Sequence, residues 1–213
     1  MQELPPALYL LAFAPAGTLI LAVIHAATAE RIAANERAAL LEQINRLIAA
    51  DAYDNNPLQD QVSLPAAALH SADPVTVYRA RRNGTPVAAV YVVTSPHGYN
   101  GRIRLVVGVR ADQTLAGVRV VSHRETPGLG DRIEAERSDW IEAFSGKSLD
   151  NPQPKGWAVQ KDGGVFDQFT GATITPRAVV NSVRDVLIWA QQHQDALFRQ
   201  AADPAPDLQE SPS

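Results

Sequence analysis

Cysteine is absent from all 213 residues of the chain. Disulfides, thiolate nucleophiles, iron–sulfur clusters and cysteine zinc sites are therefore excluded. Histidine is scarce: there are five, and none has the HxxxH or HExxH spacing of a metal site. The sequence therefore predicts no metal site, and we assign no catalytic residue.

An excess of positive charge is also lacking. Lysine and arginine number 19 against 23 acidic residues, which gives a formal net charge of −4 at pH 7. Binding to a phosphate backbone requires a basic face, so nucleic acid is excluded as a partner. Hydrophobic residues make up 46% of the chain, and this content excludes wholesale disorder.

The N-terminal segment contains a long uncharged run, from Leu4 to Ala29. About 20 apolar residues suffice for a helix that crosses a bilayer, so residues 1–29 are predicted to be a transmembrane anchor. A cleaved signal peptide requires preceding positive charge, and none is present. The small residues 26–29 nevertheless resemble a cleavage site, which leaves open a secreted domain that begins near Glu30.

Three further regions follow the anchor. Residues 30–64 are predicted to be a helical extension and a linker, because apolar residues recur at helical spacing to residue 50 and polar residues with Pro57 follow. Residues 65–200 are predicted to form one domain. The acidic, proline-rich residues 201–213 are predicted to be a disordered tail.

The predicted domain has an α+β fold, an antiparallel sheet with flanking helices. Asn83-Gly84 is typical of a hairpin turn, and short links between apolar segments imply antiparallel pairing. One helix is expected at residues 131–144. Another should begin with Thr175 as N-cap and Pro176 as first residue, and end near Arg199. The four predicted strands cover residues 75–81, 87–93, 103–109 and 115–121.

A short segment, Asp167-Gln-Phe-Thr-Gly-Ala-Thr173, stands just before the last predicted helix. The free N–H groups and the dipole of a helix N-terminus stabilise a bound phosphate. Gly171 permits close backbone approach or a positive φ. On spacing alone, however, the segment is more typical of a plain turn before a capped helix.

This segment resembles the D-x-x-[ST]-G-A-T signature of FMN-binding domains, in which a flavin transferase joins FMN to the last threonine through a phosphoester. Residues 123–132 contain Glu-Thr-Pro-Gly-Leu-Gly and resemble the loop that approaches the flavin in that family. Behind an apolar N-terminal run, the two motifs are similar to G subunits of Rnf-type ion-translocating oxidoreductases. Two alternatives stay open: the C subunit of the sodium-pumping NADH:quinone oxidoreductase, for which the chain is short, and a tethered binding module without cofactor.

The resemblance implies a role for each motif residue, and covalent FMN at Thr173 is the first. Thr175 is a hydrogen-bond candidate, although helix capping would also explain it. Recognition by the flavin transferase is implied for Asp167, Thr170, Gly171 and Ala172. Flavin contact is implied for Glu125, Thr126, Gly128, Leu129 and Gly130.

The resemblance also implies partners and a location. The chain would carry electrons between ferredoxin and NAD, coupled to ion movement, together with the other subunits of the complex. It would be a single-pass protein of the bacterial inner membrane with the FMN domain on the periplasmic side. Arg31 and Arg37 follow the apolar run, and the positive-inside rule places that side in the cytoplasm. Charge and resemblance thus predict opposite topologies.

Overall fold

The computed structural model describes residues 28, 31, 34–35 and 38–204. They are divided between two compact units, of which Leu41–Ala205 contains the sheet and is the domain described below. The predicted transmembrane anchor, apart from Thr28, lies outside the described residues. Within the described part of the chain, no helix is long and apolar enough to cross a membrane.

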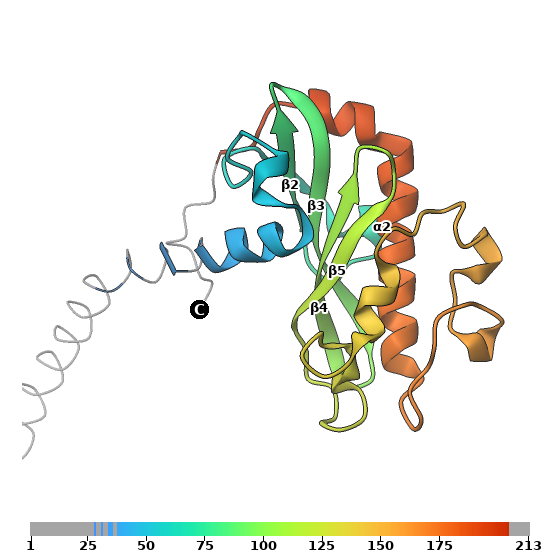
Figure 1. Cartoon of the computed structure of the whole chain (residues 1–213). Coiled ribbons are helices and arrows are strands. Elements are labelled where there is room, and N and C mark those ends of the chain that lie inside the picture. Colours follow the sequence, from blue (N-terminus) through green and yellow to red (C-terminus); the bar gives the residue numbers. More distant parts are fainter. Residues whose placement is uncertain (1–27, 29–30, 32–33, 36–37, 205–213) are drawn as a thin grey trace, which may run out of the picture. The chain divides into compact units, whose positions relative to one another are not determined.

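An antiparallel sheet of five strands in chain order forms the centre of the domain (Figure 1). All four predicted strands are confirmed. The predicted linker was wrong over its last four residues, which form an additional edge strand because Val62 and Leu64 are buried there. The strands are β1 Gln61–Leu64, β2 Val75–Arg82, β3 Thr85–Gly98, β4 Gly101–Arg110 and β5 Leu115–Ser122.

The turn between β2 and β3 has the predicted chemistry. Asn83 and Gly84 have φ angles of 49° and 76°, and two successive positive φ angles match the right-handed twist of a hairpin. Further along the chain, Gly98 and Gly101 pair where β3 passes into β4. This second hairpin ends beside the candidate site described below.

Helix α2, Ile174–Arg199, covers one face of the sheet. Its predicted apolar stripe is confirmed, since Val179, Val183, Val186, Leu187 and Ala190 are all buried. The helix starts earlier than predicted, with Thr173 at the N-cap position. The predicted cap at Thr175 was wrong, because this residue lies in the first turn and its hydroxyl bonds to Glu125.

The helix predicted over residues 131–144 was also wrong. The chain instead forms two short 3-10 helices, η3 Asp131–Ile133 and η4 Asp139–Phe144. Between them Glu134 and Ser138 are extended, and the Ser138 side chain accepts a hydrogen bond from the Trp140 amide to start η4. The other short helices are η1 Ala50–Ala52, η2 Ala66–Leu69, η5 Pro154–Gly156 and η6 Gln160–Asp162.

The helical residues 41–47, which belong to the same unit as the sheet, lie on the opposite face of the sheet from α2 (Figure 1). Residues 38–47 are helical, and Ile44, Leu47 and the following Ile48 are buried. Gly108 and Gly117 pair between β4 and β5, and a Cβ at either would stand only 3.3 or 3.0 Å from Leu47. Because glycine within strands allows close approach, the two glycines form a notch for Leu47.

We predict that Leu47→Ala lowers the free energy of unfolding by about 3 kcal/mol, because it empties this notch and removes buried methyl groups. Ile188→Ala is the matched control, since Ile188 is an exposed apolar residue on α2. The control should change the value by less than about 0.5 kcal/mol. Urea unfolding followed by tryptophan fluorescence measures both. Equal effects of the two substitutions would contradict the notch.

The predicted disorder of the tail was wrong for its first residues. The Asp203 amide donates to the Gln61 carbonyl at 2.8 Å, and the Asp203 carboxylate accepts from the Ser63 amide at 2.6 Å. These bonds cover the free edge of β1, which would otherwise present unpaired backbone groups. Residues 205–213 of the predicted tail lie outside the described residues.

Candidate functional site

The two sequence motifs meet at the N-terminal end of α2. Thr173 precedes the helix with φ −80° and ψ −29°, and its side chain makes no capping hydrogen bond. It is half-buried. The Thr173 hydroxyl is therefore not engaged in a capping hydrogen bond to the helix that it precedes.

The first motif, residues 167–173, forms a loop that packs against aromatic residues of the domain. Phe169 is buried and packs edge-on against Trp140 with centroids 5.2 Å apart, while the Trp140 indole N–H donates to the Asp167 carbonyl at 2.8 Å. Thr170 and Gly171 are exposed, and Gly171 has a φ of 82° that favours glycine. The exposed half of the motif is thus open to another protein.

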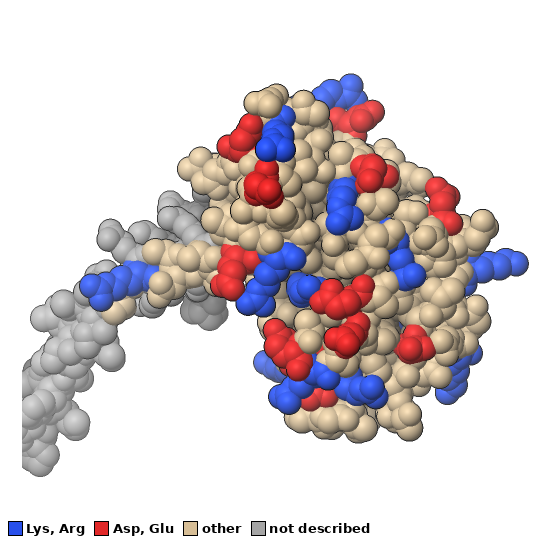
Figure 2. Space-filling model, viewed as in Figure 1, with Lys and Arg blue, Asp and Glu red and all other residues tan. Residues whose placement is uncertain are grey.

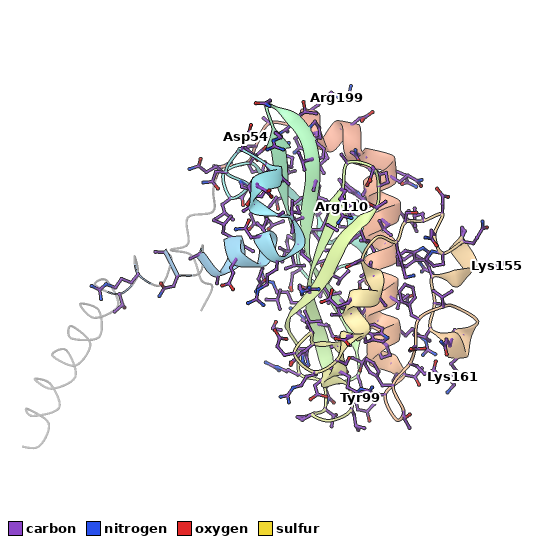
Figure 3. All side chains as sticks on the ribbon, viewed as in Figure 1. Asp54, Tyr99, Arg110, Lys155, Lys161 and Arg199 are labelled. Carbon is purple, nitrogen blue, oxygen red and sulfur yellow. The ribbon has the colours of Figure 1, made fainter. Side chains whose placement is uncertain are left out.

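The remaining motif residues flank this exposed turn. Ala172 donates its amide to the Phe169 carbonyl at 3.0 Å and is half-buried against the core. The Asp167 carboxylate is exposed and accepts a hydrogen bond from the side-chain amide of Gln160 at 2.5 Å. Lys155, which precedes the motif in the sequence, is exposed on η5 (Figure 3).

The second motif forms a compact turn. The Thr126 carbonyl accepts from the amides of Leu129 and Gly130 at 3.1 and 3.0 Å, and Gly128 has a φ of 79°. Leu129 is 43% exposed, and its Cδ2 lies 3.6 Å from where a Cβ of Gly171 would stand. The two motifs are therefore in close proximity, although they are far apart in the chain.

Two residues of the second motif, Glu125 and Gly130, are buried beneath this turn. The Glu125 carboxylate accepts hydrogen bonds from the backbone amides of Tyr99 and Asn100 and from the Thr175 hydroxyl. Gly130 is buried against both Glu125 and Thr175. The structure therefore joins the second motif to the start of α2 through Glu125, whose carboxylate faces inward.

Two apolar residues that the sequence did not single out also belong to this end of the domain. Ile174 follows Thr173 and is 44% exposed, and Tyr99 is 66% exposed on the hairpin between β3 and β4. Figure 3 shows Tyr99 at the end of the domain where α2 begins. Together with Leu129 they form what we call the apolar rim. The signal in the sequence that could have identified Tyr99 and Ile174 is a large apolar side chain between small or polar neighbours.

The basic side chain in the first turn of α2, Arg177, is paired with a nearby carboxylate. The Arg177 guanidinium bonds to Asp162 at 2.6 and 2.9 Å, which raises the pKa of Arg177 and lowers the pKa of the Asp162 carboxyl. The first turn of α2 contains no acidic residue. Figure 2 shows both signs of charge interspersed over the visible face. An anion at this helix end would thus be bound by backbone N–H groups.

Comparison with known proteins shows which family the chain resembles. Residues 98–188, which include both motifs, match the family model of the FMN-binding domain, and residues 5–47 match that of the RnfG N-terminal region. The G subunit of the ion-translocating oxidoreductase complex from Pseudoalteromonas atlantica is 46% identical over 180 residues, 84% of each chain. The chain belongs to this G-subunit family. The family predicted from the two motifs is therefore confirmed.

Two more members of the G-subunit family show the same extent of similarity. The Vibrio atlanticus protein is 44% identical over 193 residues, which cover 91% of this chain and 92% of the relative. The protein of Pseudomonas aeruginosa strain UCBPP-PA14 is 46% identical over 193 residues, 90% of both chains. Similarity thus extends over nearly the whole chain.

Proposed function

We propose that this chain is the electron-carrying flavin subunit of an ion-translocating oxidoreductase complex, with FMN joined through a phosphoester to Thr173. The meeting of the two motifs at the start of α2 carries the proposal. There the Thr173 hydroxyl, which makes no capping hydrogen bond, lies at the start of α2, and Leu129 of the second motif lies close to Gly171 of the first. The chain would act only together with its partner subunits.

The residues present fit both ends of FMN. A phosphate on Thr173 would face the helix N-terminus, where the dipole and the backbone N–H groups stabilise negative charge. A planar aromatic ring would cover part of the apolar rim, namely Tyr99, Leu129 and Ile174. Removal of this surface from water favours the bound state at about 25 cal/mol per Å².

Residues of the chain would hold and orient the cofactor, and the cofactor would supply the redox chemistry. FMN supplies one- or two-electron transfer when bound. Thr173 would anchor it, and the exposed part of the loop of residues 125–130 would contact it. The exposed turn at Thr170 and Gly171, with Asp167 and Ala172 beside it, is the surface that the flavin transferase would recognise.

Expression of the full chain together with the flavin transferase tests the cofactor. We expect a band that fluoresces under ultraviolet light after denaturing electrophoresis, because a phosphoester survives unfolding. A wild-type chain that stays colourless under these conditions favours the tethered binding module without cofactor. Purification in mild detergent and identification of the co-purifying subunits then distinguish an Rnf-type complex from a sodium-pumping NADH:quinone oxidoreductase.

We further propose that the apolar N-terminal run is a single-pass anchor in the bacterial inner membrane and that the FMN domain is periplasmic. The match of residues 5–47 to the RnfG N-terminal region supports an N-terminal element shared with the family. A covalent tether suits a compartment that lacks the cytosolic FMN pool. The arginines after the run favour the other orientation, so the side requires a direct test.

Single introduced cysteines provide that test, because the chain has none of its own. Gln153 is exposed and makes no capping hydrogen bond, so Gln153→Cys should react with a membrane-impermeant maleimide once the outer membrane is permeabilised. Gln2→Cys, before the apolar run, should stay unlabelled until the inner membrane is lysed. Labelling in the reverse order would place the domain in the cytoplasm.

A further inference from the structure

Glu125 is buried beneath the loop of residues 125–130, with 4% of its surface exposed. The amides of Tyr99 and Asn100 donate to its carboxylate at 3.2 and 2.9 Å. The Thr175 hydroxyl donates to the same group from α2. One carboxylate therefore joins three segments: the hairpin between β3 and β4, the second motif, and the start of α2.

The surrounding backbone packs closely around the Glu125 side chain. A Cβ at Gly98 would stand 2.9 Å from Glu125 Oε1, and a Cβ at Gly130 would stand 2.8 Å from Glu125 Cβ. The Cβ at Gly130 would also lie 3.0 Å from Thr175 Oγ1. Both glycines thus allow the close approach that the three segments require.

The backbone of Glu125 is fixed independently of its side chain. Its amide donates to His123 Nδ1 at 3.0 Å, and His123 Nε2 lies 2.6 Å from the Glu134 carboxylate. Because Nδ1 accepts a hydrogen bond, the ring proton is on Nε2 and is donated to Glu134. These bonds hold the start of the loop, while the buried carboxylate of Glu125 faces inward toward Tyr99 and Asn100.

We propose that Glu125 and Thr175 form a clasp that positions the flavin without touching it. The clasp rests on the proposed function, since it matters only if FMN is attached at Thr173. Thr175 lies two positions after Thr173, so the clasp and the tether occupy the same turn at the start of α2. It would hold Leu129 and Tyr99, two members of the apolar rim, at a fixed place relative to the tether.

Thr175→Val and Thr175→Ser form a matched pair for the first test. Valine has the shape of threonine without the hydroxyl, and serine retains the hydroxyl. Hydrogen exchange by mass spectrometry is measured on the full chain in detergent, expressed without the transferase. The Tyr99 and Asn100 amides should exchange about fivefold faster in the valine variant, which corresponds to the loss of one ordinary hydrogen bond. The serine variant should match the wild type.

Flavin mobility provides the second test, on chains co-expressed with the transferase. Fluorescence polarisation of the attached flavin should fall in Thr175→Val and recover in Thr175→Ser. A general loss of stability would not be expected to lower polarisation selectively. Glu125→Gln is an additional variant. The NH2 group of glutamine is a donor and would face a backbone N–H that now donates to a carboxylate oxygen, so this hydrogen bond would be lost and the same turn loosened.

The outcomes separate the clasp from the proposed function. If the wild-type chain acquires no flavin, the attachment proposal fails, while hydrogen exchange still decides the clasp. If Thr175→Val and Glu125→Gln both exchange at Tyr99 and Asn100 like the wild type, the clasp is wrong. Faster exchange with unchanged flavin polarisation would reject its role in positioning the flavin.

Discussion

Thr173→Val is expected to abolish covalent flavin attachment. The phosphoester needs a hydroxyl oxygen, and valine retains the size and shape of threonine without it. The Thr173 side chain makes no capping bond and is half-buried, so the domain should fold normally. Intact mass of the chain co-expressed with the transferase should lack the increment of one FMN phosphoester, and the fluorescent band should disappear.

Thr85→Val is the matched control for this result. Thr85 is exposed at the start of β3 and lies outside both motifs. Its replacement should leave attachment complete, because neither the acceptor oxygen nor the exposed turn of the motif is altered. Full attachment in the Thr173 variant would refute the assigned tether, whereas loss in both variants would indicate a defect common to them.

Asp60→Ala should lower the free energy of unfolding by about 3 kcal/mol, the effect of breaking a buried ion pair. The Arg79 side chain is 1% exposed and pairs with Asp60. Arg79 also donates to the carbonyls of Leu197 and Gln200 at 2.6 and 2.7 Å, where α2 ends. Removal of Asp60 would leave this guanidinium buried without its counter-charge.

Asp73→Ala is the control for the buried charge. Asp73 pairs with Arg102 at 2.9 Å, but the two side chains are 46% and 65% exposed. A surface pair of this kind contributes less than about 1 kcal/mol. Urea unfolding of both variants can be followed through the chain's three tryptophans, all of which lie in the domain. Equal losses would show that the charge of Asp60 is not needed by Arg79.

Local patterns account for the elements that were predicted correctly. Strands with several alternating apolar residues and the Asn83-Gly84 turn are specified within a few positions. Strand β1 was missed because only Val62 and Leu64 alternate in it. The helix predicted over residues 131–144 had apolar residues at helical spacing, yet extended backbone at Glu134 and Ser138 divides it.

Thr175 shows most clearly what a local pattern leaves undecided. A threonine before proline fits a helix cap, and this was the local alternative to a hydrogen-bonding role. Its actual partner, Glu125, is distant in the chain and becomes adjacent only when the sheet and α2 pack together. Tyr99 enters the site in the same way, through its backbone bond to Glu125.

The sequence alone determined the family and the expected attachment residue, because both depend on short contiguous motifs that need no partner from elsewhere in the chain. It also determined most of the sheet and the buried stripe of α2. Only the tertiary structure decided which segments surround Thr173, which residues form the apolar rim, and that Glu125 faces inward. These features arise from contacts between distant residues, and no fixed spacing in the sequence encodes them.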